Sequence, residues 1–288
     1  MNLRGAKPVI DNSVKSFINS LSPASCLYSE NLHEEFTNRF FDWINSSVFN
    51  QIEGLDNFQN RKLIAGTIQA FDHFYLRHYR RRFRFFRGEF MYHSACLKQT
   101  IAWEWLDDRT IDSNDAVIVS VPFSDWGTQR DITDILNQCN DLDVPVLLDF
   151  AYFPCTKNIH IDLDKYPCVE TLAFSVSKAF YGGEFLRVGM RLQRQDWDDG
   201  VDVFNSVDMI NRVSIGIANE LIKEYPVDHN WRAYSTIYSD VCSELNLKET
   251  DCIMFGIGGD EYSEFNRGTA VNRVCISELI GEKLNGRS

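Results

Sequence analysis

The 288-residue chain combines 44% hydrophobic with 24% charged residues, a composition that is typical of folded globular proteins and excludes extended disorder. Its 29 lysines and arginines stand against 41 aspartates and glutamates, and the net charge of −12 disfavours unspecific attraction to nucleic acid or to an anionic membrane. No apolar run reaches the length of a signal peptide or a membrane span. We therefore expect a cytoplasmic protein that binds no membrane.

Hydrophobic periodicity predicts helices that alternate with short buried strands. In chain order the expected elements are helix 31–49, helix 61–80, strand 115–121, helix 131–139, strand 144–149, strands 169–174 and 186–191, and helix 203–225. Strands that are apolar on both faces and separated by helices indicate an α/β fold, with a mostly parallel sheet covered by helices on both faces. Ligands of such sheets bind beyond the carboxyl ends of the strands, so polar residues that follow the apolar runs are the functional candidates.

The eight cysteines are scattered, with no CxxC pair and no histidine at zinc-finger spacing. We expect reduced thiols that act as small buried hydrophobic residues, and no metal site. The cysteines are Cys26, Cys96, Cys139, Cys155, Cys168, Cys242, Cys252 and Cys275.

Residues 77–87 interleave arginines with aromatic residues, as surfaces that bind single-stranded nucleic acid do. The acidity of the chain favours another interpretation. In that interpretation residues 80–82 form a solvated helix end, where cations suit the helix dipole, while Phe83, Phe85 and Phe86 enter the core. We expect no nucleic-acid partner.

Two motifs follow expected strands, namely Asp149-Phe-Ala-Tyr152 and Ser175-Val-Ser-Lys178, and Arg187-Val-Gly189 comes soon after. Taken singly, Asp149 could be a helix N-cap and Lys178 a surface lysine. In this order on an α/β pattern, the segments resemble the cofactor site of the class I/II aminotransferase family, which are pyridoxal 5'-phosphate (PLP) enzymes of fold type I. The resemblance implies an N-terminal segment at 1–24, a large PLP-binding domain at 25–225, and a small, reduced C-terminal α+β domain at 226–288.

The resemblance assigns three residues to the chemistry. Lys178 would hold PLP as a Schiff base, the internal aldimine, and would then move a proton as general base and acid. Asp149 would keep the pyridine nitrogen protonated, because an adjacent negative charge favours the cationic form, and PLP then acts as an electron sink. Tyr152 would offer its hydroxyl to the phenolic oxygen of PLP.

The PLP phosphate requires cations and hydrogen-bond donors. Ser175 and Arg187 match the phosphate ligands of the family, and the planar guanidinium suits a phosphate. Gly66 and Thr67 match the backbone amides that receive the phosphate at a helix start. Alternatively, these two residues fall in the middle of the helix expected at 61–80.

The segment Phe90-Met-Tyr-His93 resembles the one whose aromatic ring stacks on the pyridine and whose histidine supports the ring-binding aspartate. We favour Phe90 for stacking, with Tyr92 as the rival. His93 is either that histidine or a hydrogen-bonded core residue.

At the substrate end, Arg273 resembles the arginine that clamps the substrate α-carboxylate. Ser124 stands where the family has an asparagine that touches PLP, and the interval from Lys178 to Arg187 is one residue longer than the commonest spacing. The chain is also shorter than typical members. Relatives complete each site from two subunits, so we expect a homodimer, in which Tyr28 is a candidate to reach the neighbouring phosphate.

The expected activity is that of an aminotransferase, which moves an amino group between an amino acid and a 2-oxo acid. Two alternatives stay open. One is another PLP-dependent reaction at the α-carbon, as in a decarboxylase or a lyase, and the other is a non-catalytic binding protein with this fold, because a fold alone does not choose a function.

Overall fold

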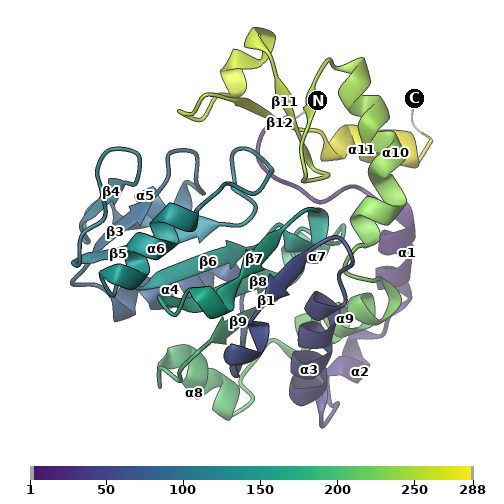
Figure 1. Ribbon diagram of the computed structural model, residues 1–288. Helices are drawn as coiled ribbons and strands as arrows, with labels where there is room; N and C mark the ends of the chain where they lie inside the picture. Colours follow the sequence, from purple (N-terminus) through teal and green to yellow (C-terminus); the bar gives the residue numbers. More distant parts are fainter. Residues whose placement is uncertain (1–2, 287–288) are drawn as a thin grey trace.

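The computed structural model describes residues 3–286, and its centre is a seven-stranded sheet (Figure 1). Strand β9 pairs antiparallel with β2 and β8, and the other neighbouring strands pair in parallel. This arrangement confirms the expected α/β fold with a mostly parallel sheet. The order across the sheet is β2 (Asn60–Ile64), β9 (Gly189–Gln193), β8 (Val169–Ser175), β6 (Val146–Phe150), β5 (Asp115–Ser120), β3 (Arg82–Phe85) and β4 (Trp103–Trp105).

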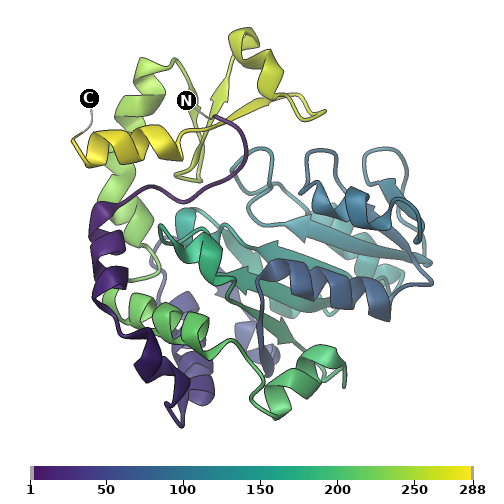
Figure 2. The same cartoon turned by 180° about the vertical axis from the view of Figure 1, so that it is seen from behind.

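Helices cover both faces of the sheet, as the doubly apolar strands predicted. Successive side chains of a strand point to opposite faces, so Val117 and Val119 of β5 join one core while Ala116 and Ile118 join the other. The first core contains side chains of α3 (Leu32–Asn45), α6 (Thr133–Asp141) and α9 (Arg212–Glu224). The second contains those of α4 (Thr67–Arg77), which lies in front of the sheet in the reverse view (Figure 2).

A smaller layer packs beyond the carboxyl ends of the strands (Figure 1). It consists of α10 (His229–Glu244), the antiparallel strands β10 (Lys248–Glu249), β11 (Phe255–Gly258) and β12 (Asn272–Cys275), and α11 (Ser277–Leu284). Its core also includes Val9, because residues 3–11, here called the N-terminal strap, run along this layer. The strap is fixed by a hydrogen bond from Cys275 N to Leu3 O. The division of the chain at residues 24 and 225 remains a prediction.

The remaining elements are shorter, and β1 and β7 form a separate parallel pair. They are α1 (Asn12–Ser20), α2 (Pro23–Leu27), β1 (Gln51–Glu53), η1 (Leu55–Asn57), α5 (Tyr92–Leu97), η2 (Phe153–Cys155), β7 (His160–Asp162), η3 (Leu163–Lys165), α7 (Gly183–Leu186), α8 (Gly200–Ser206) and η4 (Asp260–Phe265).

The helix expected at 61–80 is wrong in its first third. Residues 60–64 form β2, which pairs with β9, and α4 begins only at Thr67. Gly66 separates the two with φ +81°, a left-handed backbone that glycine adopts without strain. The helix expected at 203–225 is also divided, because Asp208 has φ +56° and Asn211 begins α9 as its N-cap.

The arginine-rich stretch is not a helix end, because α4 ends at Arg77 and Arg82 opens strand β3. Phe83, Phe85 and Phe86 are buried, as expected. Arg84, in the same strand, is also fully buried, and its Nη1 lies 2.6 Å from Asp115 Oδ2 at the start of β5. A buried ion pair thus lets an arginine occupy a central strand.

All eight cysteines are free, and five of them are buried as expected, whereas Cys26 and Cys168 are partly exposed and Cys96 is exposed. Across residues 3–286, no helix has the length and apolarity needed to cross a bilayer, and no group of metal-ligating side chains comes together.

Candidate active site

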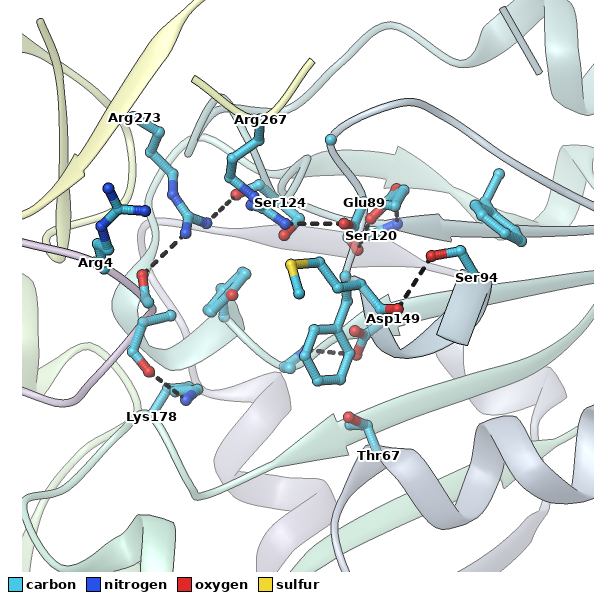
Figure 3. Close-up of a pocket in the computed structure, with 18 of the residues that line it drawn as sticks. Arg4, Thr67, Glu89, Ser94, Ser120, Ser124, Asp149, Lys178, Arg267 and Arg273 are labelled. Atoms are coloured by element: carbon cyan, nitrogen blue, oxygen red, sulfur yellow. Dashed lines mark hydrogen bonds between the residues drawn. The ribbon is translucent and has the colours of Figure 1, made fainter. Parts of the chain in front are cut away.

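A cavity of about 590 Å³ lies at the carboxyl ends of the strands, between the sheet and the smaller layer (Figure 3). Its walls come from the ends of β3, β5 and β6, from the turn after β8, from the first turn of α4, from the N-terminal strap and from residues 264–267. Cavities with a few convergent polar groups at this position of an α/β sheet are typical ligand sites.

The fold brings most of the expected site residues to this one cavity. Three are not part of its lining, namely Gly66, which borders it, and the buried Ser175 and His93. The expected residues that line it are Thr67, Phe90, Ser124, Asp149, Tyr152, Lys178, Arg187 and Arg273.

Asp149 is buried near the end of β6, and its Oδ1 accepts a hydrogen bond from Ala151 N at 3.0 Å. Burial raises the pKa of its carboxyl to about 8, and the negative charge of Glu89 adds to this. Among the described residues no lysine, arginine or histidine forms an ion pair with it. The cavity therefore presents a carboxyl group that lacks a cationic partner.

Lys178 follows β8 by three residues, and its amine lies in the same cavity as Asp149 (Figure 3). Its Nζ donates to Ala6 O of the N-terminal strap at 2.5 Å. Burial lowers the pKa of this amine, because the interior disfavours the charged form. A lowered pKa favours the uncharged amine, which is the form that attacks carbonyl groups.

The first turn of α4 and Arg187 form a cradle at one end of the cavity. Thr67 and Ile68 occupy the first positions of α4, where backbone N–H groups have no partner within the helix. Arg187 Nη2 donates to Ala65 O at 3.3 Å and lies 2.9 Å from the point where a Cβ of Gly66 would sit. A helix N-terminus beside a guanidinium is suited to a phosphate group.

Ser175, the expected phosphate ligand, does not face the cavity, whereas the neighbouring Ser177 does. Ser175 Oγ donates to Ser177 Oγ at 2.8 Å and accepts from Ser177 N, so it is engaged within the turn. Ser177 lines the cavity, whereas Ser175 does not. Of these two serines, Ser177 is therefore the one that presents its hydroxyl to the cavity, and Ser175 holds it in place.

The segment 90–93 places its three ring side chains in different surroundings. Phe90 lines the cavity, whereas Tyr92 is directed to α4, where its hydroxyl donates to Asp72 Oδ1 at 2.7 Å. His93 is fully buried, and its Nδ1 lies 2.6 Å from the Tyr75 hydroxyl. Its Nε2 has no hydrogen-bond partner among the described residues, so no bond between His93 and Asp149 is formed.

Arg273 enters the cavity from β12, opposite the sheet (Figure 3). Its Nη1 donates to Ser124 O at 2.5 Å and its Nη2 to Gly5 O at 2.9 Å, so its partners are carbonyl groups and not carboxylates. Tyr152 also lines the cavity, and burial raises the pKa of its hydroxyl. Arg273 thus brings a positive charge that a substrate carboxylate can satisfy.

Tyr28 directly follows α2, and 84% of its surface is exposed. It is not part of the cavity lining.

The sequence did not indicate four charged residues that line the cavity, of which Arg4 and Glu264 are exposed, whereas Glu89 and Arg267 are more deeply placed. Glu89 is fully buried, its Oε1 accepts from Ser120 N at 2.9 Å, and its Oε2 accepts from the Ser120 hydroxyl. Arg267 Nη2 donates to Glu89 O at 2.9 Å, and Arg267 Nη1 lies 3.4 Å from Asp125 Oδ1. Neither residue follows an expected strand, so no local pattern marked it.

The sequence matches no family model and no curated protein. Its structure is similar to that of alanine aminotransferase from Pyrococcus furiosus, with a TM-score of 0.66, 13% identity, and coverage of 99% of this chain and 90% of the other. It is also similar to tyrosine aminotransferase from Leishmania infantum, with a TM-score of 0.63, 12% identity, and coverage of 98% of this chain and 90% of the other. A third similar structure is that of a PLP-bound C-S lyase from Staphylococcus hominis, with a TM-score of 0.61, 11% identity, and coverage of 99% of this chain and 87% of the other.

Proposed function

The chain has the aminotransferase-like fold of type I, as the sequence resemblance implied, and we propose that it is a PLP-dependent aminotransferase acting on an amino acid and a 2-oxo acid. The observation that carries this proposal is the common cavity of Lys178 and Asp149, an amine and a carboxyl group distant in sequence, each buried and each without an ion-pair partner among the described residues. A protonated pyridine between them would form an ion pair with the carboxylate of Asp149, and an aldehyde would bond the amine of Lys178.

Three features of the cavity fit this cofactor. Asp149 is a buried carboxyl group whose ionised form a cation would stabilise, Phe90 supplies an aromatic face, and the cradle of Thr67 and Arg187 supplies the donors that a phosphate needs. The glycine at 66 leaves free the space that a Cβ would take from Arg187. Lys178, Asp149, Thr67, Ser177 and Arg187 would therefore hold PLP, with Tyr152 and Ser124 beside it.

PLP, when bound, withdraws electron density from the substrate α-carbon. Asp149 then holds the proton at the ring nitrogen, because its negative charge stabilises the cationic ring. Lys178 would hold the cofactor through its amine, and once that amine is free its Nζ would take the proton from the substrate α-carbon and deliver it to the cofactor carbon that carried the amine. Arg273 orients the substrate by a bidentate bond to the α-carboxylate.

We also propose that the protein acts as a homodimer. Large apolar side chains are exposed on α7, at the end of α2 and just before α9, and both α2 and α7 pack against α9. Phe185, 79% exposed, stands two residues before Arg187, and Tyr28 and Met209 are 84% and 66% exposed. Exposed apolar groups of this size are typical of protein interfaces, and sedimentation of the purified protein measures the state directly.

The half-reaction with single amino acids tests the activity. Purified protein with added PLP is expected to absorb in the visible range, and a reactive amino acid is expected to remove that band while a 2-oxo acid is released. The matched control is Arg273→Leu, which keeps the cofactor residues and loses the carboxylate clamp.

Other results would point to other functions. Release of carbon dioxide or ammonia without an exchange of the amino group would indicate a decarboxylase or a lyase. A protein that binds PLP but leaves every amino acid unchanged would be a binding protein, and one that does not bind PLP would contradict the proposal altogether.

A further inference from the structure

Arg267 has no role in the chemistry described so far, although it lines the same cavity as Arg273. Arg267 lies in the loop between η4 and β12, and Arg273 lies in β12 itself. Figure 3 shows both side chains entering the cavity from the smaller layer, near Ser124. The cavity therefore has a second guanidinium group at the end where Arg273 is expected to bind the substrate.

The two guanidinium groups meet neighbouring residues of one loop. Arg273 Nη1 donates to Ser124 O at 2.5 Å, and Arg267 Nη1 lies 3.4 Å from Oδ1 of the next residue, Asp125. Burial, and after it the positive charge of Arg273, lowers the pKa of Arg267, as expected when one cation lies near another. An anion that contacts both groups would offset this repulsion.

The loop that carries Arg267 is held in position by hydrogen bonds. The side-chain amide of Asn266 donates to Thr269 O at 3.0 Å, and the Thr269 hydroxyl donates to Asp125 Oδ2. Arg267 itself donates from Nη2 to Glu89 O at 2.9 Å. The position of its guanidinium group is therefore fixed by contacts with both the smaller layer and the sheet.

Both guanidinium groups have donors to spare. Each has five N–H groups, and the described residues accept two hydrogen bonds from Arg273 and one from Arg267. Arg273 is 7% exposed, and its Nε is buried without a hydrogen-bond partner among the described residues, as is Nη1 of Arg267. Because buried donors are costly to leave unpaired, this arrangement favours an acceptor that a ligand supplies.

The charges around the two arginines favour one further negative charge. Asp125 is fully buried and is not part of the cavity lining. Glu89 directs both carboxyl oxygens to Ser120 and meets Arg267 through its backbone carbonyl. The two guanidinium groups together with the carboxylate of Asp125 carry one positive charge, which a single carboxylate of a ligand balances.

We propose that Arg267 is a second residue that binds the substrate α-carboxylate, together with Arg273. A carboxylate has about four lone-pair sites on its two oxygens, so it can accept hydrogen bonds from two guanidinium groups at once. Charge-assisted hydrogen bonds of this kind are shorter and stronger than neutral ones. This role rests on the proposed function and adds one residue to the same site.

The test compares two probes in the PLP-loaded protein, an amino acid that reacts in the half-reaction and the primary amine that corresponds to it without the α-carboxylate. Titration of the visible band measures the affinity for each. In Arg267→Gln the affinity for the amino acid is expected to fall about 10- to 100-fold, a typical cost of losing a charged hydrogen-bonding group, while the affinity for the amine stays unchanged. Equal losses for the two probes would indicate a structural role or a contact with the substrate side chain, and would overturn the proposal.

Two further variants serve as controls. Arg267→Lys keeps a positive charge beside Asp125 but lacks the planar fork of donors, so it is expected to melt like the wild type and to lose about tenfold in affinity for the amino acid alone. Arg4→Gln is the matched control, because Arg4 also lines the cavity but is exposed and pairs with Glu264. Both affinities are expected to stay at their wild-type values in Arg4→Gln.

The possible failures of the two proposals can be told apart. Unchanged affinity for the amino acid in both Arg267 variants would overturn the role of Arg267 while the proposed function stands. A wild-type protein that does not bind PLP, or whose visible band no amino acid alters, would overturn the proposed function and the role of Arg267 with it.

Discussion

The two ends of the cavity are built in different ways. At the cofactor end, Ser120 and Asp149 stand on paired strands whose hydrogen bonds fix their spacing. At the substrate end, Arg273 is held by the carbonyl groups of Gly5 and Ser124, which belong to the N-terminal strap and to a loop. The backbone hydrogen bonds between two strands fix the distance between their residues. By contrast, a side chain that bonds the carbonyl groups of loops can exchange one acceptor for another. We therefore expect the sheet to hold the proposed cofactor in one position, and the strap and loops to adapt to the substrate.

The strongest test of the cofactor end is Asp149→Asn. The amide has nearly the shape of the acid but no charge to stabilise a protonated ring, so kcat is expected to fall by about 10²–10³-fold, a typical cost of removing one preorganised electrostatic group. Single-turnover absorbance with a reactive amino acid measures the change. Unchanged kcat would show that the strand-end carboxyl group does not serve the cofactor.

At the substrate end, Arg273→Leu removes a charged hydrogen-bonding group. Such bonds contribute about 1.5–3 kcal/mol, so KM is expected to rise about 10- to 100-fold, with a smaller change in the affinity for PLP. Parallel titrations with an amino acid and with PLP separate the two effects. If PLP affinity fell as much as substrate affinity, the two ends would not be independent.

The phosphate cradle is tested by a pair of glycine variants. Gly66→Ala and Gly268→Ala both place a Cβ at positive φ, +81° and +88°, and both are expected to lose about 1–3 kcal/mol of folding stability. Only Gly66→Ala displaces the Arg187 guanidinium, because nothing lies within 4 Å of a Cβ at Gly268.

We expect PLP affinity to fall about tenfold in Gly66→Ala, which corresponds to about 1.4 kcal/mol, and to stay unchanged in Gly268→Ala. Equal affinities in the two variants would argue against Arg187 as a phosphate ligand.

The last expected effect is on the pH dependence of stability without cofactor, which needs no activity assay. The pKa of Asp149 is raised from 3.8 to about 8 in the folded state, so the folded protein binds the proton more tightly than the unfolded chain. The contribution of this group is fully present below pH 3.8 and is lost as pH rises toward 8. Asp149→Asn is expected to flatten the fall of unfolding free energy over this window, as measured by urea denaturation, and a slope equal to that of the wild type would exclude the raised pKa.

The apolar runs of β6 and β8 indicated the polar residues that follow them, whereas Thr67, Phe90 and Arg273 were indicated only by the resemblance to a family. Asp149 and Lys178 come after β6 and β8, whose buried residues form apolar runs. Strand β3 carries two arginines in four residues, and the burial of Arg84 depends on Asp115, thirty-one positions later. Without a recognisable strand before it, Glu89 could have been found only through the resemblance, which began one residue later, at Phe90.

Other parts of the site depend on distant contacts in the same way. The boundary at Gly66 was ambiguous, because residues 61–80 have helical spacing while the pairing of β2 with β9 decides the structure of its first residues. Arg267 lies in a loop whose position depends on Glu89 and Asp125, and a loop carries no periodicity.

The central claim is that the Lys178 amine bonds PLP, and trapping that bond measures it most directly. Borohydride added to the protein with PLP, followed by peptide mass mapping, is expected to find one phosphopyridoxyl group per chain on the peptide that contains Lys178. Lys178→Ala is expected to lose both this label and the visible absorption band. Labelling spread over surface lysines, or a visible band that persists in Lys178→Ala, would contradict the account.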